Sequence, residues 1–171
     1  MTHYKNILVK RDQLLGPNLP TFYDQPVHLV KGKDVWVWDI DGKKYLDCYN
    51  NVPHVGHCHP KVVEAIYKQS STLNTHTRYI HEGILNYIEK LTQTFNFDLT
   101  TAIMTCTGSE ANDIALRIAQ TITNAKGIIS TNHTYHGNTA LVSQLSDTNP
   151  SSSCSFTTCK RVFAPDSYRL I

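Results

Sequence analysis

An apolar run that stops at a polar turn and continues as a helical pattern constrains this chain more than any other feature. The run covers residues 102–106, and the turn is Thr107-Gly108-Ser109. Apolar residues then recur at the spacing of one helical face: Ala111, Ile114, Ala115, Ile118, Ala119 and Ile122. The pattern predicts a strand, a tight turn and a helix, which are the elements of an α/β fold.

The turn has the residues of an anion-binding site. Gly108 has no Cβ, so a ligand can approach the backbone closely. Ser109 is predicted to cap the helix, whose first N–H groups attract a phosphate group. The negative charge of Glu110 interacts favourably with the helix dipole, but its side chain is expected to point away from a bound phosphate. The turn matches neither a Walker loop nor a dinucleotide motif, and many helices begin this way without a ligand, so a second element is needed.

The second element is the segment at residues 133–139, which follows another apolar run at residues 127–130. It brings an aromatic ring, an imidazole and a glycine to the end of a predicted strand. Ligands of α/β sheets bind outside the carboxyl ends of the strands. Tyr135 is therefore expected to stack on a flat ring whose phosphate lies on Gly108 and Ser109. The alternative is an aromatic side chain at a turn that packs on the core.

Both elements resemble motifs of the class III aminotransferases, the ornithine and 4-aminobutyrate type that depends on pyridoxal 5′-phosphate (PLP). Residues 107–113 resemble the phosphate turn of that family, and residues 135–137 resemble its ring-stacking motif. Residues 32–47 resemble its N-terminal strand hairpin, and residues 55–60 resemble its glycine–histidine–proline loop. The resemblance runs in the family's order from about Pro20 to the C-terminus.

Within the family, residues 50–59 and 73–78 are most similar to the branch of phosphoethanolamine phospho-lyases and alanine–glyoxylate-type enzymes. The resemblance implies the N-terminal part of a fold type I PLP-dependent transferase, with a small-domain β hairpin and part of the large-domain mixed sheet. Residues 1–80 would form the N-terminal segment and small-domain part, and residues 81–171 the first part of the PLP-binding large domain. Because 171 residues cover only the first part of the family pattern, the chain is expected to be truncated.

The same resemblance implies a cofactor site for PLP. Thr107, Gly108 and Ser109 would bind its phosphate group. Tyr135 would lie on the face of its pyridine ring, and His136 would flank that ring. The two motifs would therefore hold one cofactor molecule.

Two groups that the family's reaction needs have no counterpart in this sequence. The family has its catalytic lysine in the second half of the large domain, and an aspartate on a later strand holds the pyridine nitrogen. Lys126 and Lys160 lie near apolar runs but outside a matching motif, and Asp113 belongs to the phosphate-turn helix. No catalytic residue is therefore predicted, and the chain alone is expected to be inactive.

The implied reaction moves an amino group from an amine or amino acid to a 2-oxo acid, in a homodimer with the active site at the subunit interface. Two alternatives stay open. One is a PLP-dependent phospho-lyase or racemase of the same family, whose distinguishing residues lie mostly beyond residue 171. The other is a non-catalytic, truncated remnant.

Composition argues against several classes of partner. Lysine and arginine number 16 and aspartate and glutamate 14, a formal net charge of +2. This charge is too small to indicate binding to nucleic acid or to a membrane surface. No apolar stretch approaches the roughly 20 residues of a membrane span, and the N-terminus has no signal-peptide core. The 5 cysteines form no Cys-x-x-Cys pair, which is typical of reduced thiols in the cytoplasm.

Three histidines, His54, His57 and His59, raise the question of a zinc site. With Cys58 between the last two, residues 57–59 are consecutive, so their side chains do not easily converge on one tetrahedral ion. No second ligand pair stands at zinc-finger spacing. No metal site is predicted.

The other elements follow from periodicity and turn signals. Helices are predicted at residues 4–15, 60–73 and 81–97. Strands are predicted at residues 27–30, 35–39, 44–47, 127–130 and 161–164. Asp41-Gly42 is a hairpin turn signal, and Pro60 suits the first position of a helix.

Overall fold

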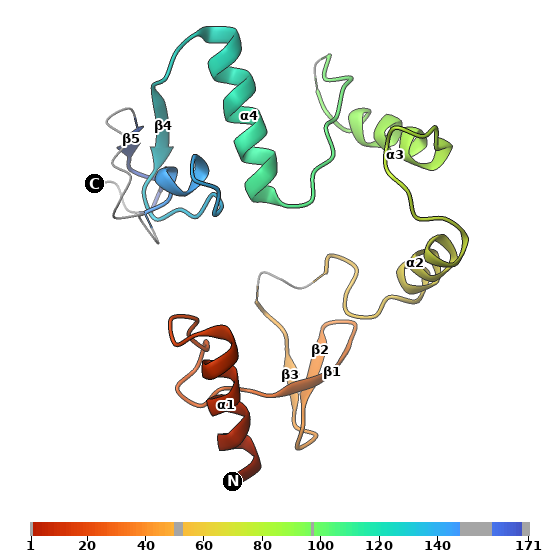
Figure 1. Ribbon diagram of the computed structural model, residues 1–171, viewed down its shortest axis with the longest axis vertical. Coiled ribbons are helices and arrows are strands. Elements are labelled where there is room, and N and C mark those ends of the chain that lie inside the picture. The colour runs from red at the N-terminus through yellow and green to blue at the C-terminus, as the bar shows by residue number, and fades with distance from the viewer. Residues whose placement is uncertain (1, 50–52, 97, 148–158, 169–171) are drawn as a thin grey trace. The chain divides into compact units, whose positions relative to one another are not determined.

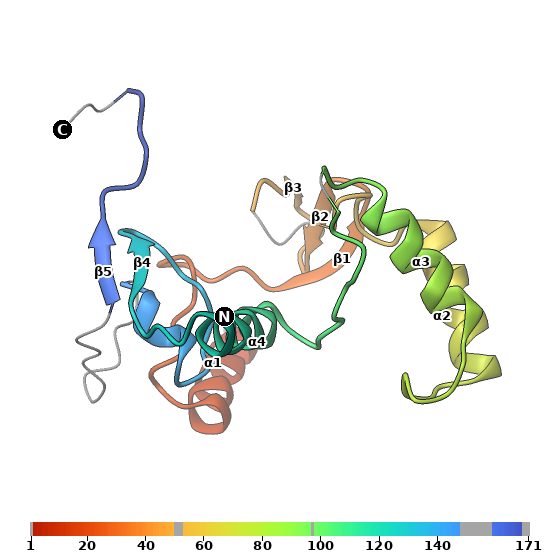
Figure 2. The ribbon, with the colours of Figure 1, turned by 90° about the horizontal axis from the view of Figure 1, so that it is seen from above.

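The described part of the chain falls into two units. The computed structural model describes residues 2–49, 53–96, 98–147 and 159–168. Contacts divide the chain into Met1–Tyr79 and Ile80–Ile171. The elements of each unit are labelled in Figure 1 and seen from above in Figure 2. The assignment of the predicted segments to small-domain and large-domain parts stays a prediction.

Three helices follow the predicted pattern. Helix α1 spans Thr2–Leu15, and α2 spans Pro60–Thr72 with the proline at its start. Helix α3 spans Glu82–Thr92 and is shorter than the predicted segment 81–97. The reason is that backbone hydrogen bonds just beyond it span three residues instead of four; residue 97 lies outside the described residues. Within those residues, no helix has the length and apolar character that a membrane span needs.

An antiparallel sheet belongs to the first unit. Its strands, in spatial order, are β1 (Leu29–Lys33), β2 (Trp36–Asp39) and β3 (Lys44–Leu46). The predicted hairpin turn is confirmed, because the Asp39 carboxylate accepts hydrogen bonds from the N–H groups of Asp41 (3.0 Å) and Lys43 (2.8 Å). Gly42 has a φ of +83°, which favours glycine. Strand β1 begins later than predicted, since its pairing starts where Leu29 lies opposite Asp39 at the end of β2.

The loop before α2 is fixed to this sheet by His57. Its Nε2 lies 2.8 Å from Asp47 Oδ2, and its side chain packs on Gly32, where an added Cβ would lie 2.9 Å from it. The bond to His57 lowers the pKa of Asp47, because it stabilises the carboxylate. His57 therefore has a structural partner. Among the residues described, no group of three or more histidine, cysteine or acidic side chains is placed to hold a metal ion.

The second unit contains a parallel strand pair and, before it in the sequence, helix α4. Helix α4 (Gly108–Thr123) and strand β4 (Ile128–Thr131) confirm the predicted helix and strand, and Asn124 ends the helix with a left-handed backbone. Strand β5 (Cys159–Val162) pairs with β4 in parallel and begins slightly before the predicted strand at residues 161–164. The two strands lie side by side in both views (Figures 1 and 2). This pairing is the expected α/β arrangement.

The small core of this unit is built on a 3₁₀ helix, η1 (Val142–Leu145). Val142 is 0 % exposed and Leu145 7 % exposed. Ser130 of β4 donates its hydroxyl to the Leu145 carbonyl at 3.1 Å, which ties the strand to η1. In the described ranges, the only other buried hydrophobic side chain is Val37, in the first unit. Within the described residues, the core of each unit is therefore small.

The predicted strand at residues 102–106 is wrong. The segment pairs with no residue that the structure describes and has no strand geometry. Ile103 and Met104 are 61 % and 52 % exposed. A strand needs hydrogen-bonded neighbours, so an apolar run alone does not form one.

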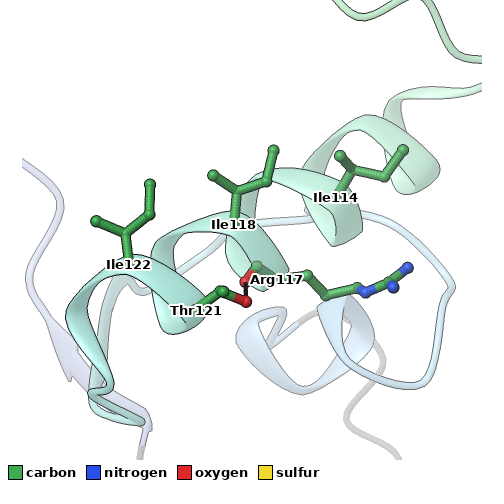
Figure 3. A pocket seen from close by; sticks show the side chains of 5 residues that line it. All are labelled: Ile114, Arg117, Ile118, Thr121 and Ile122. Carbon is green, nitrogen blue, oxygen red and sulfur yellow. Dashed lines mark hydrogen bonds between the residues drawn. The ribbon is translucent and has the colours of Figure 1, made fainter.

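One face of α4 is open and apolar. Ile114, Ile118 and Ile122 follow one another along the helix, and Arg117 and Thr121 lie beside them (Figure 3). Ile118 is 43 % exposed and Ile122 is 78 % exposed. The predicted apolar face exists, but the described residues leave it largely uncovered.

We expect Ile122→Lys to change the free energy of unfolding by less than about 0.5 kcal/mol, because the side chain is already exposed. Self-association should fall, since a charge then interrupts the apolar face. Urea unfolding and analytical ultracentrifugation check both effects. A loss above about 1 kcal/mol would mean that this face is packed in solution.

Candidate functional site

Helix α4 begins with a side-chain cap at Thr107. Its Oγ1 accepts a hydrogen bond from the Glu110 N–H at 3.1 Å, and its carbonyl accepts one from the Ala111 N–H at 3.0 Å. The prediction that Ser109 caps the helix is therefore wrong. The helix starts at Gly108, so Ser109 already lies inside its first turn.

Glu110 folds back toward the start of the turn. Its Oε2 accepts a hydrogen bond from the Cys106 N–H at 2.9 Å. With the Thr107 cap, this bond makes a variant of the capping box, in which a glutamate side chain satisfies an N–H before the helix. The Glu110 side chain thus stabilises the turn itself; that it points away from a bound phosphate stays a prediction.

Two N–H groups at this helix end stay available. Among the described residues, the N–H groups of Gly108 and Ser109 have no hydrogen-bond acceptor. A Cβ added to Gly108 would meet no atom within 4 Å, and the residue has no positive φ. The protein itself therefore does not require glycine at this position, and the space in front of the helix end is open to a ligand.

The segment after β4 is held by Asp147. Its carboxylate accepts hydrogen bonds from the N–H groups of His133 and Thr134, the second at 2.7 Å. These bonds lower the pKa of Asp147, because they stabilise the charged carboxylate. His133 has a φ of +56°, so the chain turns sharply there. The segment therefore leaves the strand in a fixed conformation.

This segment then contacts the start of α4 at Gly137. The Asn138 N–H donates a hydrogen bond to Ser109 Oγ at 3.1 Å. A Cβ at Gly137 would lie 2.5 Å from that Oγ and 2.7 Å from the Ser109 Cα. The approach is possible only for glycine. Since Ser109 Oγ accepts this bond, its O–H remains a donor for a ligand.

Tyr135 and His136 lie just before this contact. Tyr135 is 59 % exposed. The His136 N–H donates to Ser146 Oγ at 2.8 Å. The His136 Nε2 is buried and has no hydrogen-bond partner among the described residues. The predicted residues thus belong to two segments that meet at Ser109.

Sequence reasoning assigned no role to two polar side chains of α4. Asn112 Nδ2 donates to the His136 carbonyl at 2.8 Å. Asp113 Oδ1 accepts from the Thr139 hydroxyl at 2.7 Å. The partners are 24 and 26 residues apart. The one local signal was the presence of two adjacent polar residues in the first turns of the helix.

We expect the N–H resonance of Thr134 to titrate with a midpoint below 3.8, the ordinary pKa of the aspartate that it contacts. A carboxylate with a lowered pKa stabilises the fold above its unfolded pKa, and the contribution is lost as the pH falls through the lowered value. NMR shifts of the wild type and of Asp147→Asn measure this. A midpoint at or above 3.8, or the same titration in the variant, would contradict the assignment.

Comparison with known proteins identifies the family. The aminotransferase class-III model matches residues 21–170. An alanine–glyoxylate aminotransferase 2-like protein of Drosophila melanogaster is 39 % identical over 137 residues, 80 % of this chain and 28 % of that protein. The ethanolamine-phosphate phospho-lyase homolog 1 of Caenorhabditis elegans is 38 % identical over 143 residues, 83 % of this chain and 30 % of that protein.

A solved structure extends the comparison to the fold. A phospholyase from Arthrobacter in complex with phosphoethanolamine is 41 % identical with a TM-score of 0.88, over 94 % of this chain and 38 % of that chain. The chain thus spans less than half the length of the relatives that it matches. Its fold is that of the N-terminal part of the fold type I PLP-dependent transferases. The chain belongs to the class III aminotransferase family, whose cofactor is PLP.

Proposed function

We propose that this chain is the N-terminal portion of a PLP-dependent class III aminotransferase. The complete enzyme would move an amino group from an amine or amino acid to a 2-oxo acid. The family match over residues 21–170 supports this reaction class. The carrying observation is the helix end with free N–H groups at Gly108 and Ser109, in contact with the segment that carries Tyr135.

The residues at this site fit PLP. The N–H groups of Gly108 and Ser109, with the Ser109 hydroxyl, would bind the phosphate, and Thr107 would fix the turn through its cap. The open space at Gly108 leaves room for that phosphate. Tyr135 would cover one face of the pyridine ring. His136 would flank the ring, and its buried Nε2 without a partner is consistent with a bound polar group.

When bound, PLP withdraws electrons from the bonds at the amine-bearing carbon of the substrate. The residues of this chain bind and orient the cofactor but supply no catalytic lysine. We therefore expect no amino transfer by the chain alone with L-alanine, glyoxylate and PLP above the rate of free PLP. Chromatographic detection of glycine measures this. Turnover would contradict the absence of a catalytic lysine from this chain, and loss of that turnover in Lys126→Arg or Lys160→Arg would identify the lysine.

A phospho-lyase of the same family is the second candidate. It is favoured by the 41 % identity and TM-score of 0.88 with the Arthrobacter phospholyase. The longest natural protein that contains this sequence should be assayed for phosphate release from phosphoethanolamine and for amino transfer to a 2-oxo acid. Phosphate release alone would select the lyase, and amino transfer alone the aminotransferase. Activity in neither assay would leave a racemase or a non-catalytic remnant, which D-amino acid analysis separates.

The complete enzyme is proposed to be a cytoplasmic homodimer that binds small-molecule substrates and neither nucleic acid nor membrane. Some curated relatives carry names that place them in mitochondria. The mitochondrion is therefore the alternative location. Light scattering of the longest natural protein and cell fractionation with an antibody against this chain test both points.

A further inference from the structure

The geometry points to Asn112, Asp113 and Thr139 as positioning residues that hold the ring-stacking segment on the end of helix α4. Asn112 binds the carbonyl of His136, and Asp113 binds the hydroxyl of Thr139. We call these two bonds, with the Ser109–Asn138 bond, the loop clamp. The inference rests on the proposed PLP site and names residues that act on that site through Tyr135 and His136.

The clamp uses one face of the helix. Positions 109, 112 and 113 are separated by three and four residues, so their side chains lie on the same side of α4. They bind the segment at three nearby points, at residues 136, 138 and 139. The open apolar face at positions 114, 118 and 122 is a separate row. The helix therefore uses one face for the site and leaves another uncovered.

Gly137 lies at the centre of the clamp. Its φ is +138°, and an added Cβ would lie 2.5 to 2.8 Å from three atoms of Ser109. No side chain fits there without moving the segment away from the helix. The segment is also held from its other side, where His136 binds Ser146 and Thr134 binds Asp147.

These contacts determine what the site presents to a ligand. The Ser109 oxygen accepts the Asn138 N–H, so the hydroxyl hydrogen is directed to another acceptor. Tyr135 lies between Thr134 and His136, whose N–H groups are both hydrogen-bonded, and it is 59 % exposed. All three bonds of the loop clamp form between groups of this chain, at residues 109–139, and none of them needs a ligand. The ring subsite is therefore organised before the cofactor binds.

The test compares Thr139→Val, which removes the hydroxyl, with Thr139→Ser, which keeps it. The ligands are pyridoxamine 5′-phosphate, which lacks a reactive aldehyde, and inorganic phosphate. In Thr139→Val we expect affinity for pyridoxamine 5′-phosphate to fall by about tenfold, while affinity for phosphate changes by less than about twofold. Thr139→Ser should match the wild type. Simple destabilisation would lower both affinities together, so the ratio isolates positioning.

Gly137→Ala gives a second, stronger test, with Gly127→Ala as its matched control. A Cβ at Gly127 meets no atom within 4 Å, and its φ is not positive. We expect Gly137→Ala to lose the preference for pyridoxamine 5′-phosphate over inorganic phosphate, and Gly127→Ala to keep that preference. Wild-type affinity ratios in both Thr139→Val and Gly137→Ala would overturn the clamp alone. No binding of pyridoxamine 5′-phosphate by the wild type would overturn the proposed site and the clamp with it.

Discussion

Replacing Gly108 with valine is expected to weaken the binding of phosphorylated ligands greatly while leaving the fold intact. The position has no positive φ, and nothing lies within 4 Å of an added Cβ, so valine meets no clash inside the protein. Valine is no worse than glycine in a helix. Its methyl groups would instead occupy the space in front of the two free N–H groups, where a phosphate would lie.

The expected loss of affinity for pyridoxamine 5′-phosphate is about 100-fold, or about 2.7 kcal/mol. Gly108→Ala, with one methyl group, should lose less. Isothermal titration calorimetry measures the affinities, and circular dichroism with thermal unfolding checks the fold. Wild-type affinity in Gly108→Val would remove Gly108 from the site. A large drop in melting temperature would show that the space is needed by the protein itself.

Val142→Asp is expected to unfold the second unit. Val142 is 0 % exposed and lies in the small core formed with Leu145. Burial of an unpaired carboxylate there costs about 3–5 kcal/mol, which is a large share of the stability of a small domain. Arg161, the cation bonded at the edge of this core, already donates a hydrogen bond to the Ser146 carbonyl at 2.8 Å.

Ile129→Asp is the matched control, because it places the same charge in the same unit at a side chain that is 73 % exposed. It should change the free energy of unfolding by less than about 1 kcal/mol. Urea unfolding followed by tyrosine fluorescence and NMR of the residues of unit two measures both variants. Equal effects of the two substitutions would contradict the described core.

The local elements could be predicted because their signals are local. The hairpin follows from Asp39 and Gly42, and α2 follows from Pro60 at its first position. The start of α4 was predicted within one or two residues, but the cap was assigned to Ser109. Threonine and serine are both good N-cap residues, so the residue types of the turn do not show whether Thr107 or Ser109 caps the helix.

Contacts between residues far apart in the sequence could not be predicted from local pattern. Residues 102–106 have a strand's apolar character but no neighbour among the described residues. The loop clamp joins residues that are 24 to 29 positions apart, and no periodicity encodes such a contact. The role of Gly137 likewise depends on its contact with Ser109. The sequence thus predicted the two candidate site segments, and the structure adds how these segments meet.

The central claim is that residues 107–109 and 135–136 form one site for a phosphorylated ring. The most direct measurement is calorimetric titration of the wild-type chain with pyridoxamine 5′-phosphate and with pyridoxamine. The account predicts saturable binding of the phosphorylated compound, at least about tenfold tighter than that of pyridoxamine, and competition by inorganic phosphate. Equal affinity for the two compounds, or no saturable binding of either, would contradict it.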